Sequence, residues 1–414
     1  MKIQFANVMF FGSVISATAL FAKPAIDASS VTMTHDASTG ETIVTYKLSG
    51  SEPAIVTMDI ETNAAHWTSI GPEALGFTGG DVNRLITETG VAKTIHWRPG
   101  RTWPGASLDK SQIRAVVKAW SKDDPPEWMV ADLTSQNNVS WFVSTNALPF
   151  GGITSPMYKR EYLLMRRIPA NHVHWWMGAK SGEVGIYNAN SENRHQVTLT
   201  KDYYMGVYAF TQNQYDFLTD KVNVGTDMKP MVNVMPDTLR GKVEGRKYPN
   251  STDIDEGSII DEIRDRVGID VDLPTSAQWE FACRAGTGTG TYIGDLTNKT
   301  VSANLDRIAW YKGNCNAVHP VGELEPNDFL LYDMLGNVDE YCLDFLDTNK
   351  VTEPQTDPKG PTSAQATESD GRGKRVLRGG DYNHDAQYCR AAHNSWGNAT
   401  ATAGRGFRLC WTLP

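Results

Sequence analysis

The sequence lacks a basic excess and the common short motifs of catalysis. Its 39 Lys and Arg residues are outnumbered by 48 Asp and Glu, which gives a formal net charge of -9 and a pI near 5.5. Because nucleic acids are bound largely by neutralising their phosphates, we expect no nucleic-acid partner. Neither a Gly-x-Ser-x-Gly nor a His-Glu-x-x-His motif occurs, and no Lys-Ser/Thr pair follows the glycines of residues 286–294. A hydrolase of either type and a phosphate-binding loop are therefore not expected.

Long apolar runs are also missing, except for one stretch near the start of the chain. Lys2 precedes the apolar segment Phe5–Phe21, which Gly12 interrupts and which the small residue Ala22 follows. A membrane span needs about 20 unbroken apolar residues, whereas this pattern is typical of a cleaved export signal. We expect residues 1–22 to be a signal peptide, with no membrane span after its removal, and the mature chain to be secreted or periplasmic.

Cysteine is scarce and confined to the last third of the chain. The sequence has five cysteines, and none of them precedes residue 283. An exported chain permits disulfides, but the odd count leaves at least one thiol outside any internal pair. The five are Cys283, Cys315, Cys342, Cys389 and Cys410.

After the signal, short segments alternate apolar and polar residues with a period of two. Turn residues separate them, and the segments are 31–36, 41–48, 54–60, 93–99, 113–120 and 139–143. This pattern predicts an antiparallel β-sandwich of immunoglobulin-like or fibronectin-like size over residues 27–145. Residues 146–157 contain Pro and Gly and are expected to be a linker. A second domain is then expected over residues 158–414.

The second domain has few helix signals among many glycine-rich loops. Ser258 precedes an amphipathic segment that Gly268 ends, which predicts a helix over 259–267. Thr275 and Gln278 have the spacing of a capping box and predict a second helix start. Few short helices between short strands predict an α+β domain rather than a parallel sheet.

Four blocks of sequence in this second domain carry a resemblance to a known family. They are LPTSAQWEFACRAGT (273–287), LYDMLGNVDEYCLD (331–344), VLRGGDYNHDAQYCRAAH (376–393) and GFRLCW (406–411). In this order and spacing they resemble the formylglycine-generating enzymes, also called sulfatase-modifying factors. The best-known members oxidise a sulfatase cysteine to formylglycine. The resemblance covers residues 163–414 and implies a C-type-lectin-like fold with few short helices and many loops.

The resemblance has two implications for the cysteines. Segments corresponding to those around Cys283 and Cys389 are joined by a disulfide in the oxidising members, which implies a Cys283–Cys389 bridge. The rival interpretation makes Cys389 a reactive or copper-binding thiolate. Oxidising members hold copper(I) between two cysteines, and soft thiolates suit that ion. Counting forward from Gly379-Gly380 places these two positions at His384 and Cys389, whereas counting backward from Gly406 leaves neither thiolate.

His384 and Cys389 are thus the candidate catalytic residues, and the loss of a thiolate in either count weighs against copper. Three more positions depart from the family pattern. Asp381 replaces the serine of the turn, Asp339 replaces the first tryptophan of the block at 337–341, and Tyr341 replaces the second.

Calcium is the other metal that the resemblance implies. By family position, Asp333 and Glu340 would supply side-chain oxygens and Gly336 and Val338 backbone carbonyls, which are the ligands that calcium prefers. A plain turn with solvated carboxylates is the alternative. Asn304 is a weaker candidate for a second calcium site.

Two functions from different classes remain. The preferred one is a binding module that holds a segment of an exported protein, such as a sulfatase, or another ligand. Its binding surface would use polar and aromatic side chains that give rigid contact area, and the candidates are Asp381, Tyr382, Tyr388, His393 and Trp396. The alternative is an active copper- and oxygen-dependent oxidase that converts a sulfatase cysteine to formylglycine.

Overall fold

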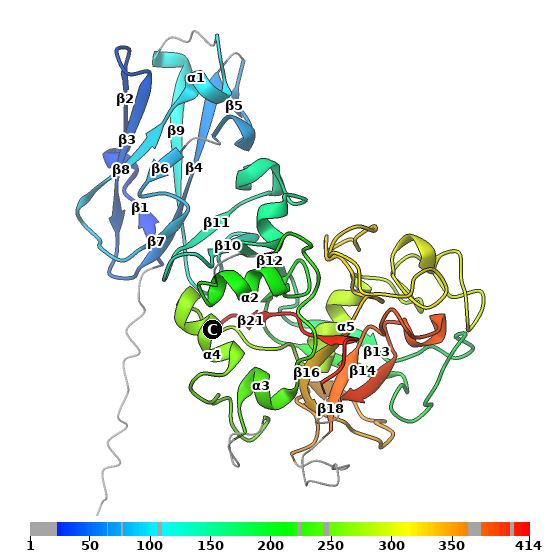
Figure 1. Cartoon of the computed structure of the whole chain (residues 1–414). Coiled ribbons are helices and arrows are strands. Elements are labelled where there is room, and N and C mark those ends of the chain that lie inside the picture. Colours follow the sequence, from blue (N-terminus) through cyan, green and yellow to red (C-terminus); the bar gives the residue numbers. More distant parts are fainter. Residues whose placement is uncertain are drawn as a thin grey trace, which may run out of the picture.

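The computed structural model describes residues 23–63, 65–75, 78–105, 110–221, 225–242, 248–362, 374–397 and 401–414. Residues 1–22, expected to form the signal peptide, lie outside this part, so that expectation stays a prediction. No helix within these ranges is both long and apolar enough to cross a membrane. Figure 1 shows a β domain, in blue and cyan, beside a larger domain rich in loops.

The first domain consists of two antiparallel sheets that share one apolar core. One sheet contains β1 (Ala25–Ile26), β2 (Thr32–Asp36), β3 (Glu41–Ser49), β6 (Thr78–Gly80) and β8 (Ala92–Trp97). The other contains β4 (Ala54–Asn63), β5 (Trp67–Ser69), β7 (Arg84–Ile86) and β9 (Ile113–Trp120), and a short helix, α1 (Pro99–Thr102), follows β8. Alternation buries every second residue of β3, and Val44 and Tyr46 pack there against Ile60 and Trp97. The all-β domain expected from the period-two pattern is confirmed.

The boundary between the domains lies earlier than the expected residue 145. Strands β10 (Trp128–Asp132) and β11 (Val139–Phe142) pair with each other and with β12 (Tyr162–Ile168), in a sheet of order β11-β10-β12-β15-β21. β10 is buried along nearly its whole length because its alternate side chains pack into apolar clusters on both faces of the sheet, Met129 and Ala131 on one and Trp128 and Val130 on the other. Residues 139–143, expected as a sandwich strand, therefore belong to the second domain, and the expected linker 146–157 forms short 3-10 turns between β11 and β12.

In its described residues, the second domain contains three sheets and four α-helices. The first sheet is completed by β15 (Tyr203–Gly206) and β21 (Cys410–Thr412). A three-stranded sheet contains β13 (Val173–Met177), β14 (His195–Leu199) and β17 (Gln355–Thr356). The third, of order β19-β18-β16-β20, contains β16 (Asp339–Phe345), β18 (Arg375–Arg378), β19 (Asn394–Gly397) and β20 (Arg405–Gly406). The helices are α2 (Gln212–Leu218), α3 (Pro236–Arg240), α4 (Ile259–Val267) and α5 (Ser276–Arg284).

Both helices expected from sequence form where their caps indicate. Ser258 Oγ accepts a bond from the Asp261 N–H at 3.4 Å to start α4, and Gly268 ends it with a φ of +69°. Thr275 and Gln278 form the reciprocal capping box at the start of α5, with bonds of 3.0 and 3.1 Å. These contacts satisfy N–H groups that the first helical turn leaves free.

Buried ion pairs connect α5 and the third sheet to the surrounding loops. Glu280 lies 2.8 Å from Arg284 and 3.1 Å from Arg378, and none of the three side chains is more than 5% exposed. Glu340 of β16 lies 2.9 Å from Arg408, and both side chains are fully shielded from water. Removing one member of such a pair leaves a charge without a partner in the interior, which costs far more than the pair itself contributes.

We therefore expect Arg408→Leu to lower the free energy of unfolding of the second domain by about 3–5 kcal/mol. Arg307→Leu is the matched control because its pair with Glu325, at 2.6 Å, is exposed at the surface of the same domain. The control should unfold close to the parent protein in urea titrations followed by tryptophan fluorescence. An equal loss of unfolding free energy in the two variants would show that the buried pair matters no more than the exposed one.

A second prediction concerns Asp344 of β16. Burial raises the pKa of Asp344 from 3.8 to about 6, although its Oδ2 accepts a bond from the Ser276 N–H at 2.6 Å. Since the folded state binds this proton more tightly, Asp344 contributes stability at low pH that is lost as the pH rises from about 4 to about 6. Asp344→Asn removes the titration. The stability of the variant relative to the parent should rise by about 2 kcal/mol across this window, measured by urea unfolding at several pH values. If the unfolding free energies of the variant and the parent change with pH in the same way, Asp344 is not the group that titrates.

Candidate functional site

A glycine turn after β18 places the loop of residues 381–389 beside the start of β16. Gly379 and Gly380 have φ values of +98° and +73°, a region that favours glycine. A Cβ on Gly380 would lie 2.8 Å from both Cys389 Sγ and the Tyr388 carbonyl oxygen, so no larger residue fits. This close approach folds the loop back on itself and directs its polar residues toward Asp339.

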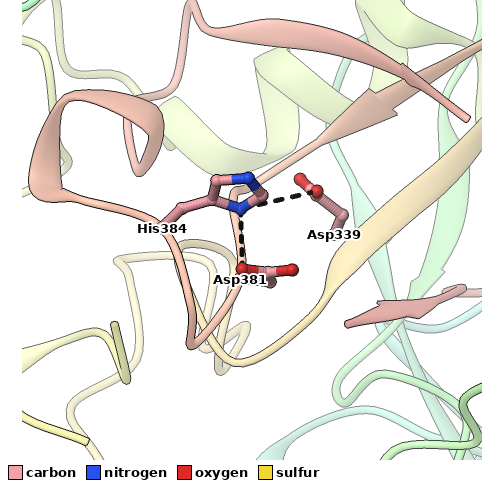
Figure 2. Close-up of side chains that lie close together, drawn as sticks. All are labelled: Asp339, Asp381 and His384. Carbon is pink, nitrogen blue, oxygen red and sulfur yellow. Dashed lines mark ion pairs between the residues drawn. The ribbon is translucent and has the colours of Figure 1, made fainter. Parts of the chain in front are cut away.

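Asp339, Asp381 and His384 meet at this point (Figure 2). His384 Nδ1 lies 2.6 Å from Asp381 Oδ1 and 4.0 Å from Asp339 Oδ2, and Figure 2 shows the imidazole facing both carboxylates. Backbone N–H groups hold the two carboxylates in place. Gly380 donates to Asp339 Oδ1 at 3.0 Å, and Asn383 donates to Asp381 Oδ1 at 2.9 Å.

The cluster is unusual because its carboxylates are removed from water. The side chains of Asp339 and Asp381 are 6% and 11% exposed, whereas that of His384 is 43% exposed. Burial, together with the negative charge of Asp381, raises the pKa of Asp339 to about 7. The short contact with Asp381 raises the pKa of His384. The arrangement therefore favours positive charge between the two carboxylates.

A pocket of about 390 Å³ opens beside the cluster. Asp339 and His384 form part of its wall, and the other side chains that line it include Tyr187, Leu377, Tyr388, His393, Trp396 and Arg405. Tyr388 connects the aromatic side chains, since its ring centre lies 5.1 Å from that of His384 and 5.4 Å from that of Tyr187. A larger hollow of about 1090 Å³ lies elsewhere, but its buried carboxylate, Asp272, is bound by Arg240 and Arg264. We therefore place the candidate site at the smaller pocket.

Only some of the residues expected to form a binding surface line the pocket. Tyr388 and Trp396 line the pocket, and Trp396 is 39% exposed with the Lys374 ammonium 3.5 Å from its ring centre. His393 reaches the pocket wall but is 2% exposed, because its Nδ1 contacts Glu192 at 3.1 Å. Asp381 belongs to the cluster. Tyr382 does not line the pocket.

The thiols do not form the bridge that the resemblance implies. All five cysteines are free, so the expected Cys283–Cys389 disulfide is not formed. Cys283 packs with its sulfur 4.0 Å from the Met334 carbonyl oxygen, whereas Cys389 packs beneath the Gly380 turn. Both thiols are fully buried, and burial raises the pKa of each. Cys389, a candidate catalytic residue, is thus a core residue below the site.

Cys315 is the thiol whose position the sequence did not indicate. It is partly exposed, and its sulfur lies 3.9 Å from the carbonyl oxygen of Tyr382, in the loop that carries His384. Its neighbours in sequence give no motif that would have indicated this contact. Tyr187 and Arg405 were missed for the same reason, since the fold alone brings them to the pocket.

The expected calcium ligands have other partners. Both carboxylate oxygens of Glu340 accept bonds from Arg408, and Trp279 Nε1 also donates to Oε2 at 2.7 Å. Asp333 Oδ2 accepts a bond from the Gly322 N–H at 2.7 Å, and the Gly336 carbonyl accepts one from the Val338 N–H at 2.8 Å. The expected ligand set does not fit a calcium ion in this arrangement, because an arginine occupies the position of the cation next to Glu340.

The weaker calcium candidate, Asn304, is also engaged. Its Nδ2 donates to the Asp295 carbonyl oxygen at 3.2 Å. This bond uses the amide nitrogen, and calcium would bind the amide oxygen, so the Asn304 site stays a prediction.

Comparison with known proteins supports the resemblance read from the sequence. The family described as "Sulfatase-modifying factor enzyme 1-like domain" matches residues 169–413, which is more than half of the chain. The chain belongs to the sulfatase-modifying factor family. The family expected from the four sequence blocks is therefore confirmed, and so is a β-rich second domain with few helices.

Several curated relatives in this family carry the name formylglycine-generating enzyme. The protein of Mycobacterium tuberculosis is 34% identical over 149 residues, covering 33% of this chain and 49% of the relative. That of Streptomyces coelicolor is 33% identical over 152 residues, covering 33% of this chain and 45% of the relative. This sulfatase-modifying factor homologue thus spans about half the length of the curated relatives it matches.

Solved structures give weaker similarity. Treponema denticola variable protein 1 aligns with a TM-score of 0.45 and 23% identity, over 64% of this chain and 98% of that chain. PvdO from Pseudomonas aeruginosa aligns with a TM-score of 0.42 and 20% identity, over 61% of this chain and 95% of that chain.

The state of the thiols is directly testable. Denatured without reductant, this family member should release five thiols to Ellman's reagent, because all five cysteines are free. In the folded protein, Cys315 should react first, since it is the partly exposed thiol and the other four are buried. Mass spectrometry of alkylated peptides identifies the site. A count of three thiols, with Cys283 and Cys389 unreactive, would instead show that these two cysteines form a disulfide.

Proposed function

We propose that this family member is an exported protein with a lectin-like second domain, and that the pocket beside the His384 loop binds a segment of another protein. The observation that carries the proposal is the exposed aromatic rim. Tyr187 and Trp396 are 64% and 39% exposed, although both line a defined pocket. Large aromatic side chains around a pocket are the usual anchors of protein recognition, because they bury much surface at small cost in side-chain entropy.

Polar groups at the same place support recognition of a peptide. Asn188, Ser191 and Asn394 line the pocket, and Asn394 Nδ2 donates to the Ser191 carbonyl oxygen at 2.9 Å. Short side chains of this kind pair with the backbone N–H and C=O groups of an extended segment. Asp339 and Arg405 add charge of both signs, which would fix the orientation of the bound segment.

Copper-dependent cysteine oxidation is the competing function. It needs thiolates that reach the substrate, whereas Cys389 is buried with a raised pKa and His384 occupies the other expected position beside Asp381. Cys315 is the one observation in favour of oxidation, because a second sulfur lies near this loop. Its pKa is also raised by burial, which disfavours the thiolate. We therefore favour binding over oxidation.

A displayed library of random peptides tests the proposal. Selection on the purified protein should enrich a family of peptides, and Tyr187→Ala and Trp396→Ala should each weaken their binding by about tenfold or more, as truncation of a central aromatic anchor does. Trp176→Ala is the matched control, because Trp176 is 49% exposed on β13 and does not line the pocket. Fluorescence anisotropy with a labelled peptide gives the affinities.

Two results would overturn the proposal. The first is equal weakening, or none, in the pocket variants and the control. The second is a peptide aldehyde, detected by mass spectrometry after the reduced protein is incubated with copper(I), oxygen and a cysteine-bearing sulfatase peptide. An aldehyde that disappears with Cys389→Ser would establish the oxidase instead.

A further inference from the structure

We propose that Asp339, Asp381 and His384 form a binding site for one divalent first-row transition-metal ion of the Mn²⁺, Fe²⁺ and Zn²⁺ type. Each residue offers one ligand atom, and the three atoms lie within 4.8 Å of one another. Among the residues that the structure describes, this is the one group of three or more His, Cys, Asp or Glu side chains with that proximity. Two carboxylates and one imidazole are donors that suit these ions, whereas copper(I) prefers sulfur.

The spacing of the donors is compatible with an ion between them. Metal–nitrogen and metal–oxygen bonds of about 2.0–2.2 Å place neighbouring ligand atoms about 3–3.5 Å apart. The two separations from His384 Nδ1 are 2.6 and 4.0 Å, which lie on either side of this range. A small rotation of the imidazole away from Asp381 and toward Asp339 equalises them. The side chain of His384 has room to move because it is 43% exposed.

A buried nitrogen without a hydrogen-bond partner is the independent observation that points to a ligand. In the described part of the chain, His384 Nδ1 is buried and makes no hydrogen bond, although it lies 2.6 Å from Asp381 Oδ1 and faces both carboxylates. The side chain of Asp339, whose Oδ2 lies 4.0 Å from the same nitrogen, is only 6% exposed. A buried polar atom without a partner is costly. A cation between the imidazole and the two carboxylates would supply the missing partner.

Neighbouring groups hold the donors as outer-shell contacts do in known metal sites. A backbone N–H fixes Oδ1 of each carboxylate. Asp381 Oδ1 and Asp339 Oδ2 are then the carboxylate oxygens nearest to His384 Nδ1. Gly404 lies against Asp381, since a Cβ there would come within 2.0 Å of Asp381 Oδ2. Only glycine leaves this oxygen its space. The sheet pairing of Asp339 with Arg405 fixes the third side of the site.

Three protein ligands leave coordination positions for water or a ligand group. Asp339 and His384 both line the 390 Å³ pocket, so these positions face the space into which a ligand would enter. An oxygen-bearing group of a bound molecule, such as a carboxylate, is the chemical class that would complete the coordination. The metal site does not depend on peptide binding, so either proposal can fail without the other.

The test is metal titration of the chelator-treated, full-length protein. Isothermal titration with Zn²⁺ and Mn²⁺ should give one ion per chain, and Co²⁺ should produce visible absorption bands that report imidazole and carboxylate ligation. Asp339→Asn, Asp381→Asn and His384→Gln should each weaken binding by about 100-fold or more, beyond the 10–100-fold typical of outer-shell contacts. Circular dichroism and melting temperatures confirm that each variant is folded.

The matched control is His96→Gln in the first domain. His96 also lies beside a carboxylate, Glu41, at 3.4 Å, but no third His, Cys, Asp or Glu of the described residues joins them, so this variant should bind the ions as the parent does. The proposal is overturned if none of the three ions binds at one per chain, which would mean that Arg405 alone neutralises Asp339. It is also overturned if binding survives the cluster variants. Copper(I) binding that is lost with Cys389→Ser and retained in Asp339→Asn would assign the metal to sulfur.

Discussion

Buried arginines hold the second domain together. A domain with short strands and long loops leaves many backbone carbonyls outside regular hydrogen bonding, and each buried one needs a donor. Arg408 donates to the carbonyl oxygens of Gly206, Val207 and Tyr332 while its charge is matched by Glu340. One guanidinium thus joins segments that are far apart in the sequence. Its five N–H groups in a fixed plane make arginine suitable for this role, and lysine could not replace it.

Buried arginines also hold the loops around the candidate site. Arg378, the last residue of β18, donates to the carbonyls of Ala391 and His393 and pairs with Glu280 of α5, so it anchors both ends of the loop that carries His384. Arg390 binds Glu183 and Glu192 at 2.7 and 2.6 Å, and Glu192 in turn contacts His393. Such pairs add little net stability, because desolvation offsets their attraction. Their effect here is to fix one arrangement of loops around the pocket.

The sequence predicted the parts of this fold that local chemistry determines. The caps at Ser258 and Thr275 place two helices correctly, because the contacts that start a helix lie within four residues. The domain boundary was wrong, since residues 139–143 alternate as a sandwich strand does and only the pairing with β10 assigns them to the second domain. Calcium ligation by Glu340 was expected from family position. Its partner Arg408 lies 68 residues away, a distance over which sequence pattern carries no information about pairing.

The cluster of Asp339, Asp381 and His384 shows why separate departures from a family pattern are best interpreted together. A buried aspartate in place of a tryptophan would by itself leave a charge without a partner, at a cost of several kcal/mol. In the count forward from Gly379-Gly380, His384 stands where the oxidising members have one cysteine of the pair. The fold brings Asp339, Asp381 and His384 together, so the imidazole lies between the two carboxylates. The three side chains therefore form a single polar cluster. Under the metal-site proposal, its oxygen and nitrogen donors suit a harder ion than the two sulfurs of the oxidising members do.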